Sequence, residues 1–118
     1  MAQPVVHFEV IGRDGAALQS FYGQLFDWSI NADNPMGYGI VEPAEGGIGG
    51  GVTQGDAPAA VFYVQVDDPA AHLARAEQLG GKTIVPVTSI PGMVTFAQFA
   101  DPEGNVVGIV AAETPPAE

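Results

Sequence analysis

His7 and Glu9 are the residues of this 118-residue chain best suited to acid–base chemistry. They lie within residues 4–11, where apolar side chains alternate with mixed ones, as in a β-strand with one apolar face. Two positions of separation place both side chains on the same strand face. An imidazole titrates near neutral pH and a carboxylate can orient it, so the pair can act as general base or ligand donor. The alternative is a structural histidine, hydrogen-bonded to Glu9 or to the backbone.

The surroundings of this pair follow from a repeat within the chain. Residues 5–28 and residues 59–82 each read as a short strand, an acidic turn and a helix, offset by 54 positions. Landmarks that coincide are Phe8 with Phe62, Val10 with Val64, Asp14 with Asp68, and Leu25 with Leu79. Neither half can bury enough apolar surface alone, so the two must pack together, and paired modules commonly leave a cleft.

Further candidate ligand-binding residues follow from the same repeat. Tyr63 and Gln65 occupy the strand face of the second copy that corresponds to His7 and Glu9. Phe96, Gln98 and Tyr38 are expected to add to the lining of the cleft. Because Glu9 is costly to keep ionised in an apolar interior, a water-filled cavity is expected beside it.

The remaining pattern predicts an α+β fold. Strands are predicted near residues 4–11, 28–31, 38–41, 48–53, 60–66, 83–87, 94–100 and 105–110, with helices after Asp14 and Asp68. Leu18, Phe21, Tyr22 and Leu25 recur at helical spacing and predict an amphipathic first helix.

We therefore expect two βαβββ modules in a pseudo-twofold arrangement, with a curved eight-stranded mixed sheet and the helices on its convex side. Modules of about 4–54 and 58–112 form one domain over residues 1–112, and residues 113–118 form a flexible tail. The turn Asp101–Asn105 fits a hairpin, with Asp at its first position and Gly104 in the left-handed region.

Composition excludes several classes of function. Fourteen acidic residues against three basic ones give a net charge of −11, so nucleic acids and anionic membranes should be repelled. The chain lacks cysteine, which removes disulfides and thiolate chemistry. No stretch resembles a signal peptide or a membrane span, so a cytoplasmic location is expected. Open sheet edges need cover, so we also expect a homodimer.

Four sequence features resemble those of a known superfamily: His7, FYGQLFDW at residues 21–28, LGGK at 79–82 and FADPEGNVV at 99–107. With them the chain resembles the vicinal oxygen chelate superfamily, which includes glyoxalases, bleomycin-resistance proteins and extradiol dioxygenases. It is most similar to a small single-domain group related to lactoylglutathione lyase, which shares GGIGGGV, Pro91-Gly92 and Gly108-Ile109. The similarity extends over about residues 4–111.

This resemblance implies a divalent metal held by four ligands, two from each module. Only His7 matches such a ligand, since Val61, Gly108 and one of Gly49–Gly51 occupy the other positions. Glu9 adds one oxygen donor, but stable sites need three or four donors. We therefore expect no metal and no other cofactor.

Three hypotheses for function follow. The chain is expected to bind or sequester a small organic ligand, as the antibiotic-resistance branch of the superfamily suggests. Alternatively, it is a lyase, isomerase or dioxygenase-like enzyme acting on a small carbonyl or aromatic compound with His7 and Glu9 in the site. A third hypothesis is an interaction module whose pocket is vestigial.

Overall fold

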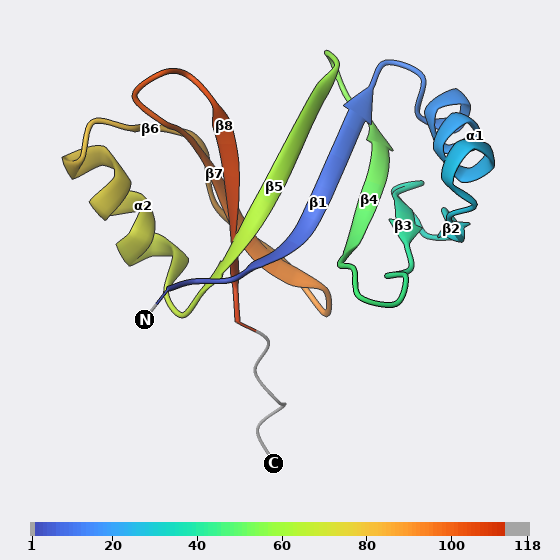
Figure 1. The fold of residues 1–118 in the computed structure, drawn as a ribbon. Coiled ribbons are helices and arrows are strands. Elements are labelled where there is room, and N and C mark those ends of the chain that lie inside the picture. The colour runs from blue at the N-terminus through green and yellow to red at the C-terminus, as the bar shows by residue number, and fades with distance from the viewer. Residues whose placement is uncertain (1, 113–118) are drawn as a thin grey trace. The chain divides into compact units, whose positions relative to one another are not determined.

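The computed structural model describes residues 2–112 and confirms the α+β fold, with eight strands and two helices (Figure 1). The predicted tail at 113–118 lies outside the described residues. The elements in chain order are β1 Val5–Gly12, α1 Gly15–Phe26, β2 Ile30–Asn31, β3 Gly39–Val41, β4 Gly49–Gln54, β5 Ala59–Val66, α2 Pro69–Gln78, β6 Lys82–Ile90, β7 Val94–Ala100 and β8 Val106–Ala111.

The described chain divides into two compact units with the same internal plan. The first unit is residues 6–62, and the second is residues 2–5 together with 63–112. Strand order is β2-β3-β4-β1 in the first unit and β6-β7-β8-β5 in the second. In each unit the first strand pairs in parallel with the last, and the other pairs are antiparallel. The repeat in the sequence therefore corresponds to a repeated βαβββ module.

The two parallel pairs have equivalent registers, which fixes the correspondence between modules. Glu9 on β1 lies opposite Gly51 on β4, and Tyr63 on β5 lies opposite Gly108 on β8. Tyr63 follows Glu9 by the repeat offset of 54. Gly51 is therefore the position in the first module that corresponds to Gly108 in the second.

Both helices begin at the aspartates that the sequence indicated. Asp14 accepts a hydrogen bond from the Ala17 N–H at 3.1 Å, and Asp68 accepts one from the Ala71 N–H at 3.2 Å. These contacts satisfy amide groups that have no partner within the first helical turn. After α2, Gly80 adopts φ of 101°, a left-handed conformation that glycine adopts readily.

The predicted turn after β7 is also confirmed. Gly104 has φ of 97°, and its N–H donates to the Asp101 carbonyl at 2.9 Å. The Asp101 carboxylate accepts from the backbone N–H groups of Glu103 and Asn105. These bonds close the hairpin between β7 and β8.

Strand β6 is longer than the sequence predicted. It extends over Lys82–Ile90 and contains Pro86, with register shifts between Thr83 and Val85 and between Val85 and Thr88. Proline lacks the N–H that a central strand needs, so it is tolerated because β6 is at the edge of its unit.

The helices differ in how well their apolar faces are covered. Val66, Leu73, Ala97 and Ile109 form the core of the second unit, with Val64 and Phe99 packed against it. On α1, in contrast, Phe21 and Leu25 of the predicted apolar stripe are exposed. The inner side of α1 is held by Tyr22, whose ring stacks on that of Trp28 with centroids 5.7 Å apart. Among the described residues, neither helix is long and apolar enough to cross a membrane.

Candidate functional site

A hydrogen-bonded chain joins His7, Tyr38 and Glu9 in the first unit. The Tyr38 hydroxyl lies 2.9 Å from His7 Nε2 and donates to Glu9 Oε2 at 2.9 Å. All three residues are partly buried, and none belongs to the fully buried core. Tyr38 thus stands between the two residues that the sequence singled out and connects them.

The direction of these bonds assigns the proton on the His7 ring. A phenol carries a single hydrogen, and that of Tyr38 is donated to the Glu9 carboxylate. His7 Nε2 must then be the donor toward the Tyr38 oxygen. Burial lowers the pKa of His7 below its ordinary 6.5, and the Glu9 carboxylate opposes this with a smaller upward effect. The imidazole is therefore neutral at pH 7, with its proton on Nε2.

Strand alternation places the hydrogen-bonded side chains of His7, Tyr38 and Glu9 on the face of the first sheet away from α1. Phe8, between His7 and Glu9, points to the other face, where its ring lies 5.2 Å from that of Trp28. Trp28 in turn stacks on Tyr22 of α1. Since neighbouring strand residues point to opposite faces, His7 and Glu9 lie on the face that the helix leaves uncovered.

Gly51 makes room for Tyr38 on this face. A Cβ added at Gly51 would overlap both the hydroxyl and the ring of Tyr38. The Tyr38 ring therefore passes over β4 at Gly51, the residue that pairs with Glu9 on β1. The glycine run thus has a specific function: it lets a tyrosine lie flat on the strand and reach Glu9.

The second unit repeats this arrangement with different polar groups. A Cβ at Gly108 would overlap the ring of Tyr63, whose hydroxyl accepts a hydrogen bond from Gln98 Nε2 at 2.7 Å. The rings of Tyr63 and Phe96 meet edge to face at 6.4 Å. The structure thus brings together three of the predicted residues, Tyr63, Phe96 and Gln98. Gln65 follows Tyr63 on the same strand face, and its backbone N–H donates to the Pro4 carbonyl.

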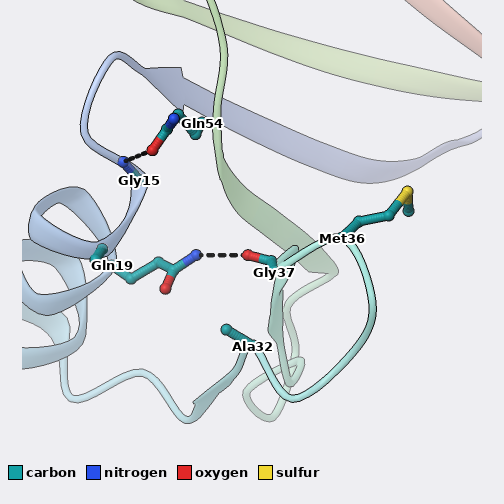
Figure 2. Close-up of a pocket in the computed structure, with 7 residues that line it drawn as sticks. Gly15, Gln19, Ala32, Met36, Gly37 and Gln54 are labelled. Atoms are coloured by element: carbon teal, nitrogen blue, oxygen red, sulfur yellow. Dashed lines mark hydrogen bonds between the residues drawn. The ribbon is translucent and has the colours of Figure 1, made fainter.

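A separate cavity of about 390 Å³ opens at the start of α1 (Figure 2). Gln54 Oε1 accepts from the Gly15 N–H at 3.3 Å, and Gln19 Nε2 donates to the carbonyls of Gly37 and Val52. Neither glutamine could be predicted from the sequence, since a lone polar side chain on a helix or at a strand end gives no distinctive pattern. Their amide groups tie α1 to β4 and to the turn before β3.

The second unit has an apolar cavity of about 350 Å³ beneath α2. Its walls come from the helix and from the sheet face that carries the core, and include Val64, Ala76, Phe99 and Ile109. It lies on the opposite face from Tyr63 and Gln98 by strand alternation. The cavity offers volume without a converging set of polar groups.

Comparison with known proteins identifies the family. A model of the family described as glyoxalase-like domain matches residues 7–110. The chain is a member of the glyoxalase-like domain family. No curated protein matches it significantly.

Solved structures with the same fold include named members of the wider superfamily. The glyoxalase-like domain is similar to a glyoxalase/bleomycin resistance protein/dioxygenase superfamily member from Vibrio splendidus 12B01, with 16% identity and a TM-score of 0.60 over 94% of this chain and 100% of that one. It is also similar to methylmalonyl-CoA epimerase from Mycobacterium tuberculosis, with 11% identity and a TM-score of 0.67 over 93% of this chain and 88% of that one. The resemblance to the vicinal oxygen chelate superfamily is confirmed, and at these identities the likeness extends to the fold alone.

The residues of this glyoxalase-like domain do not fit the divalent metal that the superfamily implies. Among residues 2–112, no group of three or more His, Asp or Glu side chains is placed to hold a metal ion. At Gly51 and Gly108, tyrosine rings occupy the space into which a ligand side chain would extend. His7 and Glu9 are two donors, and both already bind the Tyr38 hydroxyl.

Proposed function

We propose that this glyoxalase-like domain binds a small organic molecule on the His7–Glu9–Tyr38 face of its first unit, without a resident divalent metal. The observation that carries the proposal is the Tyr38 hydroxyl, which accepts from His7 and donates to Glu9 at 2.9 Å each. Both protons of this chain are donated within it, so the neutral imidazole, the phenol and the carboxylate present hydrogen-bond acceptors to an incoming donor group.

The charge of the site favours neutral or cationic ligands over anions. Glu9 supplies a carboxylate to the face, while the lowered pKa of His7 keeps the imidazole uncharged. The net charge of −11 adds a repulsive field for anions, most strongly at low ionic strength. The Tyr38 ring adds an aromatic surface against which an aromatic ligand can pack.

Three probes of similar size and different charge test this proposal: benzylamine, benzyl alcohol and benzoate. Titration followed by ¹H–¹⁵N NMR should shift the backbone amides of Glu9, Tyr38 and Gly51 with the first two probes and much less with benzoate. Tyr38→Phe retains the ring and removes the hydroxyl, so it should weaken binding by about tenfold, equivalent to one good hydrogen bond. His72→Ala, an exposed histidine on α2, serves as the matched control and should bind like the wild type. Shifts that are equal for benzoate, or unchanged by Tyr38→Phe, would contradict the proposal.

A second candidate function is proton transfer on a small carbonyl compound. Its support is the neutral imidazole beside a phenol that already shares its proton with a carboxylate. The imidazole can accept a proton at Nδ1 from the carbon next to the carbonyl, and the Tyr38 hydroxyl can turn from Glu9 to donate to the enolate oxygen that forms. Incubation of acetophenone in D₂O should then show methyl-proton exchange above the buffer rate that is lost in His7→Ala. Exchange at the buffer rate would leave binding as the only function proposed for this site.

A further inference from the structure

Helix α1 carries an aromatic cluster that helix α2 lacks. In the first unit, Tyr22 stacks on Trp28 with ring centroids 5.7 Å apart, and Phe26 lies 5.1 Å from the same Trp28 ring. The repeat offset of 54 matches these three aromatic residues to Ala76, Gly80 and Lys82 in the second unit. Two of these counterparts are small, and the third is an exposed lysine. The second unit therefore has no aromatic side chain of its own at these three positions.

A cavity of about 350 Å³ borders Ala76, beneath α2. Its floor is the apolar core of the second unit, where Val66 and Ile109 are 2% and 4% exposed. Phe99 and Val64 add half-buried side chains to the walls, which are almost entirely apolar. Because an apolar cavity of roughly 150 Å³ is large enough for a benzene ring, this one can accommodate a single ring with a substituent.

Arg75 places a positive charge at the mouth of this cavity. The residue borders the cavity and is exposed, so its methylene groups belong to the wall and its guanidinium group lies toward solvent. Among residues 2–112, the guanidinium group has one hydrogen-bond acceptor, the Gln78 side-chain oxygen at 3.2 Å. The N–H groups of an arginine form a planar fork that matches a carboxylate, and most of those on Arg75 remain available to a ligand.

Asp101 also borders the cavity, but its carboxylate is already hydrogen-bonded. It accepts from the backbone N–H groups of Glu103 and Asn105 and from the Asn105 side-chain amide, each at 2.9 Å. His72, another titratable residue of the lining, has its ring Nδ1 3.3 Å from the carbonyl oxygen of the residue that caps α2. Arg75 is therefore the charged residue of the lining whose hydrogen-bonding groups are mostly unused.

We propose that the cavity beneath α2 binds a single-ring aromatic carboxylate, with its ring against Ala76 and Phe99 and its carboxylate at Arg75. The apolar walls remove the ligand ring from water, and the Phe99 ring offers it an aromatic partner. A charge-assisted hydrogen bond to the guanidinium group fixes the orientation, because the polar groups lie at the mouth. This site is in the second unit, so it is distinct from the ligand-binding face proposed for the first unit.

The shape and the charge of the protein both limit the affinity. The cavity is open to solvent, so a bound ring keeps part of its surface in water, and the net charge of −11 opposes an anion. A salt concentration of about 150 mM screens charges that lie more than about 8 Å away and leaves the contact with Arg75. Under that condition we expect a dissociation constant on the order of 1 mM.

Titration with benzoate, followed by ¹H–¹⁵N NMR of the full chain, tests the proposal. Benzoate should shift the backbone amides of Ala76, Gly81 and Phe99, which border the cavity. Acetate carries the same charge without the ring and should not shift them at the same concentration. The absence of shifts at ten times the expected dissociation constant, or equal shifts with acetate, would overturn the proposal.

Two variants test the two parts of the site separately. Ala76→Tyr introduces the residue found at the corresponding position of α1 and should occupy the cavity, so benzoate should lose its effect on Gly81 and Phe99. Arg75→Gln should weaken benzoate binding by about tenfold, since a charge-assisted hydrogen bond is lost. Arg13→Gln is the matched control, because Arg13 is an exposed arginine of the first unit and the change in net charge is the same. It should alter benzoate binding by less than about twofold.

Circular dichroism verifies that each variant is folded. If the larger side chain of Ala76→Tyr prevents folding, Ala76→Leu takes its place with the same expectation. Equal losses of affinity in Arg75→Gln and Arg13→Gln would show that only the net charge matters and would contradict the proposal, as would full benzoate binding in the cavity-filling variant. The amides of the ligand site in the first unit are followed in the same spectra, so either site can fail alone.

Discussion

Gly51 lies beneath the Tyr38 ring, and alanine at this position should break the hydrogen-bonded chain without touching His7 or Glu9. A Cβ at Gly51 would overlap the hydroxyl and ring of Tyr38, so the ring must move away from the strand. Movement of the ring separates the hydroxyl from both of its partners.

The magnitude follows from the contacts that are lost. A hydrogen bond to a neutral partner such as His7 contributes about 1 kcal/mol, and one to the charged Glu9 about 1.5–3 kcal/mol. Replacement of a strand glycine by alanine returns about 0.5–1 kcal/mol by reducing the entropy of the unfolded chain. Because the groups are only partly buried, we expect a net loss of about 2 kcal/mol in the free energy of unfolding.

A double-mutant cycle in urea, followed by circular dichroism, tests this reasoning. In a Tyr38→Ala background the clash with the ring is absent, so Gly51→Ala should stabilise the protein by about 0.5–1 kcal/mol, which gives a coupling energy of about 2.5–3 kcal/mol. Gly23→Ala is the control of opposite sign, because it lies inside α1 with its nearest neighbour, the Trp28 carbonyl, at 3.6 Å. It should stabilise the protein by about 0.5–1 kcal/mol. Equal costs of Gly51→Ala in both backgrounds, within about 0.5 kcal/mol, would refute the account.

Three further predictions follow from the same structure. Gly108→Ala should displace the Tyr63 ring and lower stability, and Gln98→Leu should remove the coupling to the hydroxyl; thermal unfolding of the two single variants and the double variant measures this. The pKa of His7 is lower in the folded state than its ordinary 6.5, so the unfolded chain binds more protons than the folded one as the pH falls through 6.5. The free energy of unfolding should therefore decline below about pH 6.5 and level off below the folded pKa. In His7→Asn this part of the pH profile should be absent. Asp14→Ala removes the cap of α1 and should cost about 1 kcal/mol, whereas Asp14→Asn should be nearly neutral.

Much of the fold could be predicted because local signals and the repeat agreed with each other. Asp14 and Asp68 start the helices where the sequence indicated, and the turn at Asp101 closes as expected. The helical period alone does not show which residues of an apolar stripe face the sheet. Phe21 and Leu25 match the period and are exposed, whereas Tyr22 of the same stripe stacks on Trp28.

The site was predictable in its residue types and less so in its connections. Strand alternation alone brought His7 and Glu9 to one face. Tyr38 lies just before the short strand β3, 31 residues after His7 in the chain, and nothing in the sequence indicates that its hydroxyl joins the pair. The role of Gly51 was equally hidden, because a glycine run is compatible with a turn, a close-packed strand or a cavity floor. Only the register of β1 with β4 distinguishes these.

One NMR experiment tests both whether the His7–Glu9–Tyr38 face binds a ligand and whether it does so without a metal. Benzylamine is titrated into protein prepared in medium that contains zinc, manganese, nickel and iron, with and without excess EDTA. The account predicts the same shifts at the amides of Glu9, Tyr38 and Gly51 in both samples, with the same affinity. Shifts that disappear with EDTA and return on addition of one metal equivalent per chain would contradict it.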